Sequence, residues 1–273
     1  MSQGPLVKMR QYKLVHGDCL TVMQKFPDRS IDLILCDLPY GTTACKWDTV
    51  IDFDKLWTNY NRIIKDDAAI VLFGSEPFSS LLRSSNLSMY RYDWIWDKKK
   101  PSNFQMMNFQ PGRIHETISV FSKRPAVYCK DKHMRYYPIK TDLDVVRKTK
   151  RTVYGSSNTT LRSNHIVDIG PSEFVGKLPK SILSYTNANT TKRLHPTQKP
   201  IDLLSYLIKT YTKNGDLVLD SCMGSGSTGI ACLNTGRRFF GIEKDAHYYN
   251  VALNRINIWK SHECSSKSTG QKN

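Results

Sequence analysis

The segment Asp216-Leu-Val-Leu-Asp220-Ser-Cys-Met-Gly224-Ser-Gly226-Ser-Thr-Gly229 decides the fold class of this 273-residue chain. Its first residues form a short apolar run typical of a buried strand, and residues 224–229 then read G-x-G-x-x-G. Glycine lets a backbone approach a ligand closely, and Glu243 follows the next predicted strand, where a carboxylate can accept both ribose hydroxyls. We predict a strand–turn–helix unit for an adenosine-type ligand. A turn that only packs the helix on the strand is the structural alternative.

Strand-like and helix-like segments alternate on both sides of this unit. Continuous apolar runs predict strands buried on both faces, and amphipathic segments predict helices between them. The expected strands are 12–15, 31–36, 68–73, 91–96, 117–121 and 238–242, and the expected helices are 20–26, 54–64, 202–211 and 248–260. This alternation predicts an α/β fold with a doubly wound, mostly parallel sheet.

Composition excludes several other classes of protein. Hydrophobic residues make up 40% of the chain, with 14 Tyr, 10 Phe and 5 Trp, so a folded core is expected. No apolar run reaches the roughly 18 residues of a membrane-spanning helix, and no secretory signal is visible, which predicts a soluble cytoplasmic protein. The seven cysteines are irregularly spaced, so we expect reduced thiols and predict neither structural zinc nor another metal site.

A basic segment interrupts the α/β alternation between residues 123 and 193. It contains 15 Lys and Arg against 5 Asp and Glu, so it carries +10 of the net charge of +16. Basic, polar and aromatic residues together are typical of nucleic-acid-contacting elements, and Lys148, Lys150 and Arg151 are the expected DNA contacts here. A solvated insertion without such a role is the alternative.

The identity of the nucleoside ligand follows from what surrounds the glycine turn. Only 44 residues follow Gly229, too few for the second mononucleotide-binding half of an NAD fold. No G-x-x-x-x-G-K-[ST] motif is present, which excludes a P-loop. Asp220 would repel a pyrophosphate but suits an ammonium group. A ligand with adenine, ribose and a cationic amino-acid end is S-adenosylmethionine.

A second motif, Asp37-Leu-Pro-Tyr40, follows the buried strand at 31–36, and His195-Pro-Thr-Gln-Lys-Pro200 follows the basic segment. With these motifs in this order, residues 12–260 resemble the β-class amino DNA methyltransferases. The resemblance implies a Rossmann-like, circularly permuted S-adenosylmethionine-dependent fold. Its expected parts are a catalytic half (1–122), a target-recognition insert (123–193), a cofactor-binding half (194–260) and a disordered tail (261–273).

The resemblance also implies roles for individual residues. The catalytic turn is Asp37, Leu38, Pro39 and Tyr40, and the cofactor-binding positions are Asp18, Cys19, Thr197, Lys199, Asp220, Gly224, Gly226, Thr228 and Glu243. Two departures from the family pattern are Leu38, where the first proline is usual, and Ser221-Cys222-Met223, where Pro-Phe usually leads into the glycines.

The resembling enzymes methylate a base that has been flipped out of the duplex. Here the Asp37 carboxylate and the Leu38 carbonyl are expected to accept the two N–H bonds of the adenine 6-amino group. Pro39 would fix the turn without a competing N–H, and Tyr40 would stack on the base. Lys46 and Trp47, in the loop that follows, would either contact DNA or pack on the sheet edge.

Three other functions stay open at this point. They are methylation of the cytosine 4-amino group, whose enzymes usually carry Ser at the position of Asp37, adenine methylation in RNA, and a non-catalytic DNA-binding subunit of the same fold. The target sequence, homodimerisation and a partner restriction endonuclease leave no readable signature in the sequence. The expected enzyme is an adenine-specific, site-specific DNA methyltransferase that uses S-adenosylmethionine on double-stranded DNA.

Overall fold

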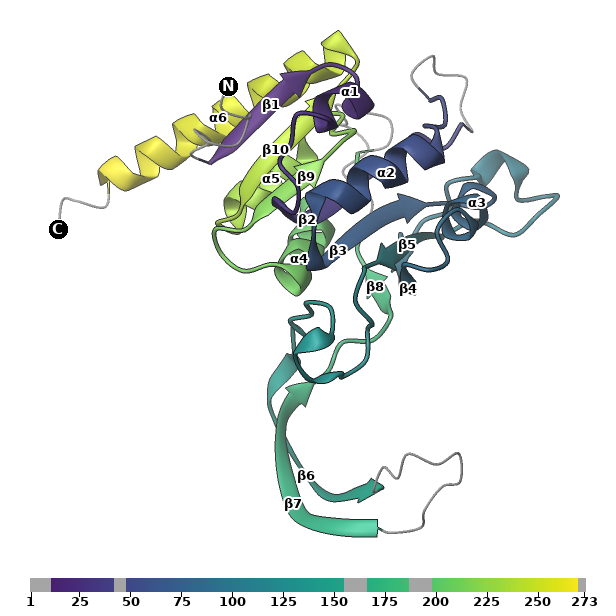
Figure 1. Cartoon of the computed structure of the whole chain (residues 1–273), viewed down its shortest axis with the longest axis vertical. Coiled ribbons are helices and arrows are strands. Elements are labelled where there is room, and N and C mark those ends of the chain that lie inside the picture. Colours follow the sequence, from purple (N-terminus) through teal and green to yellow (C-terminus); the bar gives the residue numbers. More distant parts are fainter. Residues whose placement is uncertain (1–10, 42–47, 155–165, 187–197, 270–273) are drawn as a thin grey trace. The chain divides into compact units, whose positions relative to one another are not determined.

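The computed structural model describes residues 11–41, 48–154, 166–186 and 198–269 (Figure 1). The chain divides into two compact units, one formed by the segments up to Tyr137 and from Ser181 onward, the other by Pro138–Lys180. The helices and strands of the larger unit are β1 (Tyr12–His16), α1 (Cys19–Met23), β2 (Ile31–Cys36), α2 (Phe53–Ile63), β3 (Ile64–Gly74), α3 (Phe78–Ser84), β4 (Tyr90–Asp97), η1 (Phe104–Met106), β5 (His115–Phe121), η2 (Lys130–Lys132), β8 (Ile182–Ser184), α4 (Ile201–Tyr211), β9 (Leu217–Asp220), α5 (Ser227–Asn234), β10 (Arg238–Glu243) and α6 (Ala246–Thr269).

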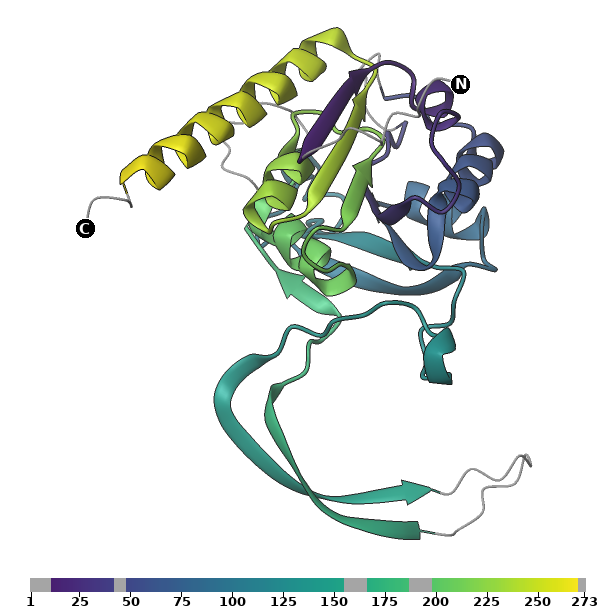
Figure 2. The same ribbon diagram turned by 60° about the vertical axis from the view of Figure 1, so that its left-hand side comes forward.

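The larger unit is built on an eight-stranded sheet in the order β1-β10-β9-β2-β3-β5-β4-β8 (Figure 2). The first five strands in this order pair in parallel. β5 pairs antiparallel with both of its neighbours, and β8 pairs in parallel with β4, so only β5 runs against the others in this sheet. The predicted α/β class with a mostly parallel sheet is therefore confirmed.

Two strands that are far apart in the sequence meet at the centre of this sheet. β2 pairs with β9 through Leu33 opposite Val218 and Ile34 opposite Leu219. From β2 the chain continues through α2 to β3 on one side, and from β9 it continues through α5 to β10 on the other. Connections that leave in opposite directions create a crevice at the carboxyl ends of the two strands, where open α/β sheets bind ligands.

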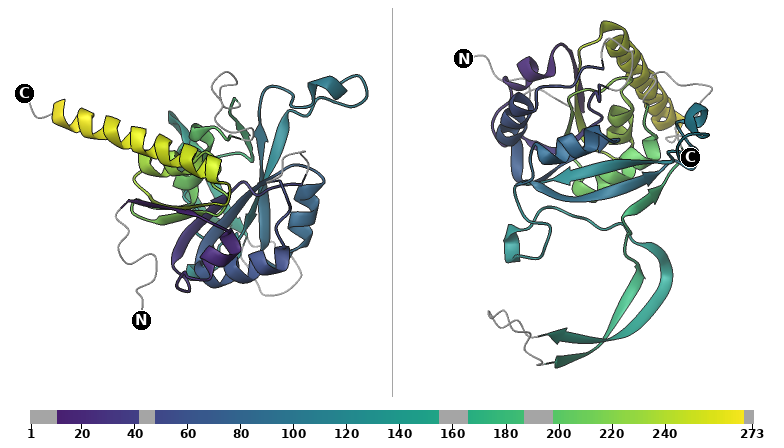
Figure 3. Two further views of the ribbon diagram at one scale, coloured as in Figure 1. Left: turned by 90° about the horizontal axis from the view of Figure 1, so that it is seen from above. Right: turned by 90° about the vertical axis from the view of Figure 1, so that its right-hand side faces the viewer.

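Alternate residues of the central strands supply two hydrophobic cores, one on each face of the sheet. Leu33 and Leu35 of β2 join the core covered by α4, α5 and α6, whereas Ile34 and Cys36 join the core covered by α1, α2 and α3. Figure 3 shows these two helix layers on opposite sides of the sheet. Because β2 is buried along its whole length, it reads as a continuous apolar run rather than an alternating one.

The smaller unit consists of one long antiparallel hairpin, β6 (Thr141–Tyr154) and β7 (Ile166–Lys177). The predicted insert of 123–193 is wider than this unit, since the segments flanking it belong to the larger unit and β8 adds a strand to the main sheet. β8 was not predicted from the sequence, because three residues carry too little periodicity to be recognised.

The C-terminal helix is longer than expected. α6 continues to Thr269, past the end predicted at Lys260, so the tail expected to be disordered from Ser261 is helical as far as Thr269. No glycine or proline interrupts 261–269, and Gly270 is the first helix breaker after them. Among the described residues, no helix is long and apolar enough to span a membrane.

Candidate functional site

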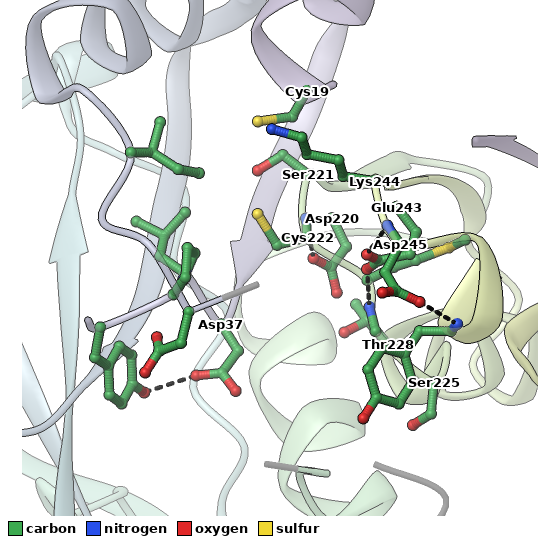
Figure 4. Close-up of a pocket in the computed structure, with 18 of the residues that line it drawn as sticks. Cys19, Asp37, Asp220, Ser221, Cys222, Ser225, Thr228, Glu243, Lys244 and Asp245 are labelled. Carbon is green, nitrogen blue, oxygen red and sulfur yellow. Dashed lines mark hydrogen bonds between the residues drawn. The ribbon is translucent and has the colours of Figure 1, made fainter. Parts of the chain in front are cut away.

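A pocket with a volume of about 490 Å³ opens at the carboxyl ends of β1, β2, β9 and β10. Each of these strands has an acidic residue at its end or just after it, and the four acidic residues line the pocket. The pocket therefore brings together four distant parts of the sequence. These lining residues are Asp18, Asp37, Asp220 and Glu243. Figure 4 shows Asp37 on one side of the pocket and the Asp220 and Glu243 carboxylates on the other.

The turn after β2 holds its aspartate firmly in place. The Tyr40 hydroxyl donates a hydrogen bond of 2.6 Å to Oδ1 of Asp37, and the Tyr40 ring stacks on Phe78 at 4.8 Å between centroids. The Leu38 side chain is buried and Pro39 lines the pocket. One face of the Tyr40 ring thus packs on Phe78, and the Tyr40 hydroxyl is hydrogen-bonded to Asp37.

The second oxygen of Asp37 belongs to a buried network of alternating charges. Nζ of Lys199 lies 2.7 Å from Oδ2 of Asp37 and 3.4 Å from Oε2 of Glu116. Oε1 of Glu116 in turn lies 3.2 Å from Nζ of Lys98, whose side chain is almost fully buried. Two carboxylates and two ammonium groups balance one another, which is the condition under which charges can be buried without a large cost.

Each charge in this network shifts the pKa of its neighbours. Burial raises the pKa of Asp37 and Glu116 adds to this, although Lys199 opposes both. Burial alone would lower the pKa of Lys199, but Asp37 and Glu116 outweigh it and raise that pKa. The pKa of Glu116 is lowered because Lys199 and Lys98 overcome the effect of burial. Lys199 therefore stays protonated and favours the ionised form of Asp37.

The glycine turn on the other side of the pocket is shaped by close packing. Gly226, at the start of α5, has φ +77°, and a Cβ there would lie 3.0 Å from Cβ of Ala252. The backbone N–H of Gly224 donates a 2.8 Å hydrogen bond to Oε2 of Glu243, and the N–H of Asp245 donates to Oε1. The turn and the acidic residue are thus locked to each other, with the carboxylate lining the pocket.

Asp220 lies deeper than Glu243 and is only 3% exposed. Burial raises the pKa of Asp220 to about 7, although hydrogen bonds from Thr228 and from the Cys222 backbone N–H oppose the shift. Asp37 also raises this pKa through charge repulsion. A carboxyl group with such a pKa gains its charge near neutrality, and a cationic ligand would favour the charged form.

The third wall of the pocket comes from the start of α1. Asp18 caps this helix by accepting a 3.2 Å hydrogen bond from the Thr21 backbone N–H. Cys19 follows it and is buried, and Cys222 lines the pocket as well. Among the described cysteines, 19, 36, 129, 222 and 232 are free thiols.

The predicted site residues separate into two groups. All predicted catalytic residues and most predicted cofactor residues line this one pocket; Gly226 lies behind it, at the start of α5. Lys148, Lys150 and Arg151 lie on β6 of the smaller unit. Three predicted positions, Lys46, Trp47 and Thr197, fall outside the described residues.

Sequence reasoning missed three contributors to the site. Asp48 accepts a 2.8 Å hydrogen bond from the Gly41 backbone N–H and lines the pocket. Phe78 supports Tyr40, and Lys98 holds Glu116. Lys98 begins a run of three lysines, and nothing in such a run distinguishes the buried lysine from its exposed neighbours.

Comparisons with known proteins agree on one family. The model of a family described as DNA methylase matches residues 31–254. The chain is 26% identical over 269 residues to the Type II methyltransferase M1.MboII of Moraxella bovis, covering 90% of this chain and 98% of that protein. It is 29% identical over 273 residues to the Type II methyltransferase M.HinfI of Haemophilus influenzae, covering 89% of this chain and 67% of that protein.

Solved structures show the same fold. The crystal structure of an M1.HpyAVI–SAM complex superimposes with a TM-score of 0.57 at 20% identity, covering 90% of this chain and 99% of that one. The cytosine-N4-specific PvuII DNA methyltransferase gives a TM-score of 0.63 at 15% identity, covering 90% of this chain and 86% of that one. A Rossmann-like architecture shared with such enzymes is therefore confirmed.

Proposed function

This chain belongs to the DNA methylase family, and on that premise we propose that it transfers a methyl group from S-adenosylmethionine to the 6-amino group of adenine in double-stranded DNA. The observation that carries this proposal is the position of Asp37. Asp37 directly follows β2, and its carboxylate lines the same pocket as Asp220, which ends the adjacent strand β9, and Glu243, which ends β10 beyond it.

The pocket suits S-adenosylmethionine on three counts. Both oxygens of Glu243 already accept backbone N–H groups, so their remaining lone pairs are fixed in direction for two ribose hydroxyls. Buried Asp220 can balance the ammonium group of the methionine end. Cys19 and Tyr248 supply apolar lining for the adenine. When bound, S-adenosylmethionine supplies an electrophilic methyl group on a cationic sulfur.

Asp37 and Leu38 orient the amino group that receives the methyl group. Because the adenine amino lone pair is delocalised into the ring, it becomes nucleophilic only when both of its N–H bonds are held out of the ring plane. The Asp37 carboxylate and the Leu38 carbonyl are the two acceptors for those bonds. Alignment and electrostatic stabilisation are then expected to provide most of the acceleration.

The other residues of the network keep Asp37 in the required state. Lys199 favours the ionised form of Asp37, and Lys98 balances the charge of Glu116, so the developing positive charge on the amino nitrogen meets a carboxylate. The Tyr40 hydroxyl fixes the Asp37 rotamer, and Tyr40 lines the pocket in which we expect it to contact the flipped base. In this proposal the residues of the chain bind the base, orient its amino group and balance the buried charges.

Methylation of the cytosine 4-amino group is the second candidate function. The two reactions share the acceptor chemistry of an exocyclic amine, and PvuII DNA methyltransferase, named as cytosine-N4-specific, has the same fold. Asp rather than Ser at position 37 favours adenine. A non-catalytic subunit finds less support because Asp37, Tyr40 and the glycines are all present, and an RNA substrate finds less support because a large basic insert between the catalytic and cofactor halves fits duplex DNA better.

The hairpin of β6 and β7 is our candidate for DNA recognition. A two-stranded antiparallel ribbon fits the major groove of B-DNA. Basic residues are concentrated on one stretch of β6, where Lys148 lies opposite Glu173 and Lys150 opposite Pro171, followed by Arg151. We propose that this stretch contacts DNA within the wider 123–193 recognition segment.

Expression in a bacterium that lacks DNA methylation tests the whole proposal. Sequencing of its native genomic DNA by a method that detects modified bases should reveal 6-methyladenine at one recurrent short sequence. Cells that express Asp37→Ala should show none. A recurrent 4-methylcytosine site would instead support the second candidate, and modification confined to RNA would reject the DNA substrate.

A further inference from the structure

Residues 98–114, which connect β4 to β5 and are here termed the 98–114 arm, expose an unusual amount of apolar surface. Phe104 is 78% exposed and Phe109 is 84% exposed, more than any other phenylalanine of the chain. Met106 and Met107, at 49% and 45%, lie between them. In Figure 3 the arm, drawn in blue-teal around η1, projects beyond the edge of the sheet. Large apolar side chains gathered in this way mark an interaction site.

The arm holds these side chains on an ordered loop. Its root extends the β4–β5 pairing, since the Lys98 backbone N–H donates to the Ile114 carbonyl at 2.7 Å and that of Ser102 donates to Arg113 at 3.0 Å. Asn103 then closes the loop, because its side chain accepts from the Arg113 backbone N–H and donates to the Pro111 carbonyl. Because the loop is already fixed, its exposed apolar residues lose little further conformational entropy when they bind a partner.

The charge of the arm is complementary to a polyanion. Residues 98–115 include three lysines and one arginine but no aspartate or glutamate. Lys99 and Lys100 are exposed at the root, whereas Gln105, Asn108 and Gln110 surround the apolar tip with amide groups. Amide side chains can hydrogen-bond to base edges, lysines neutralise phosphates, and apolar wedges such as Phe and Met insert between base steps.

A second copy of the chain would suit the same surface less well. In a two-fold contact the same patch faces itself, so Lys100 and Arg113 of both copies would lie near one another, whereas Lys98 and Lys99 are balanced by Glu116 and Asp97. The apolar tip and basic root together therefore favour DNA over self-association.

The root of the arm is also tied to the catalytic turn. Lys98 pairs with Glu116, Glu116 with Lys199, and Lys199 with Asp37, at N–O distances of 3.2, 3.4 and 2.7 Å. Lys98 additionally donates to the Ser102 hydroxyl within the arm at 3.1 Å. DNA held on the arm would thus be held beside the pocket that receives the flipped base.

We infer that the 98–114 arm is a second DNA-contacting element, whose Phe104 and Phe109 side chains press against bases while Lys99 and Lys100 contact phosphates. This inference rests on the proposed function for its ligand, duplex DNA. The 98–114 arm belongs to the larger unit and is separate from the β6–β7 hairpin.

Fluorescence anisotropy with labelled, unmethylated duplex DNA tests the inference on the full chain. The double variant Phe104→Ser/Phe109→Ser should bind at least about tenfold more weakly, since stacking on one base is commonly worth that much. Lys99→Gln/Lys100→Gln should reduce the salt dependence of binding by about one to two counterions, because Lys99 is also paired with Asp97. The matched control Leu81→Ser/Leu87→Ser removes two other exposed apolar side chains from the same unit and should bind DNA normally.

Two further measurements separate the possible outcomes. S-adenosylmethionine affinity, measured by calorimetry, should be the same for all variants, which excludes misfolding. Undiminished DNA affinity in the phenylalanine variant would overturn the inference, as would a change confined to its sedimentation, which would assign the arm to self-association. A wild-type protein that does not bind duplex DNA would reject the proposed function, whereas wild-type binding without adenine methylation would leave the test of the arm intact.

Discussion

Nζ of Lys199 lies 2.7 Å from Oδ2 of Asp37, which joins the start of α4 to the catalytic turn after β2. Lys199 lowers the pKa of Asp37 and so opposes the effect of burial. Its positive charge, which is buried, is shared with Glu116. The ionisation state of the carboxylate that receives the substrate therefore depends on a lysine from the other half of the sequence.

Lys199→Met should make methylation more sensitive to acid. Without the lysine, the pKa of Asp37 rises, so the acidic limb of the kcat profile should move to higher pH and activity at pH 6 should fall more than activity at pH 8. Lys209→Met removes an exposed lysine from α4, the helix that follows Lys199, and should leave the profile unchanged. A uniform loss of activity at all pH values would contradict the assigned role, because it would indicate a structural effect.

Binding of S-adenosylmethionine should strengthen as the pH rises through about 7, the pKa to which burial raises Asp220. Below this pH the carboxyl group is protonated and must lose its proton to balance the cationic end of the ligand. Affinity should therefore approach a tenfold gain per pH unit well below 7 and level off above it. Calorimetry of wild type and Asp220→Asn measures this; the variant should bind weakly with little pH dependence. An equally steep dependence in the variant would assign the titration to another group.

Glu243→Gln should weaken S-adenosylmethionine binding by about tenfold or more without changing the base that is methylated. The amide keeps one oxygen acceptor but loses the other and the charge, and a hydrogen bond to a charged group contributes about 1.5–3 kcal/mol. Equilibrium binding measures the effect, with Glu76→Gln on the surface as control. An affinity equal to that of wild type would remove Glu243 from the ribose site.

Asp32 provides a test of stability away from the pocket. It is 2% exposed, accepts the Leu217 backbone N–H, and lies 2.6 Å from Nζ of Lys65 and 2.9 Å from NH1 of Arg135. Burial raises its pKa, but these three partners outweigh burial and lower it. Since the folded-state pKa is depressed, the ionised group stabilises the fold above its unfolded-state pKa, and this contribution is lost as the pH falls through the folded-state value.

Asp32→Asn should accordingly lower the free energy of unfolding by about 3 kcal/mol at pH 7, because it leaves partners of a buried ion pair uncompensated. The difference from wild type should shrink at pH 3. Asp66→Asn, whose partners are also Arg and Lys but at the surface, should have little effect. Urea denaturation at both pH values measures the comparison. A constant difference between the two pH values would contradict the ionic explanation.

The parts of this molecule that sequence predicts well are those with a local signal. β2 is recognisable because it is buried on both faces and hence continuously apolar, and the glycine turn is recognisable because Gly226 needs a left-handed backbone packed against Ala252. Glu243 could be found because it follows the next strand. All three depend on residues close in the sequence or on a parallel sheet that brings strand ends together.

Other features depend on contacts that no local pattern records. Lys98, Glu116 and Lys199 meet only after β4, β5 and α4 have assembled, so their sequence neighbours give no sign of the network. The described side chains of the β6–β7 hairpin, at 141–146 and 173–177, are mostly exposed, and the sequence there shows no apolar alternation by which its strands could be predicted. The exposure of the phenylalanines in the 98–114 arm could not be predicted either, because phenylalanine in a sequence normally indicates a buried core residue.

The most direct test of the proposed reaction uses S-adenosylmethionine with a trideuterated methyl group and unmethylated genomic DNA. After incubation with the purified protein, the DNA is digested and its deoxynucleosides are identified by mass spectrometry, with Asp37→Ala in parallel. We predict trideuterated 6-methyl-deoxyadenosine with the wild type and none with the variant. Trideuterated 4-methyl-deoxycytidine as the sole product, or equal yields from wild type and variant, would contradict the account of Asp37 and adenine given above.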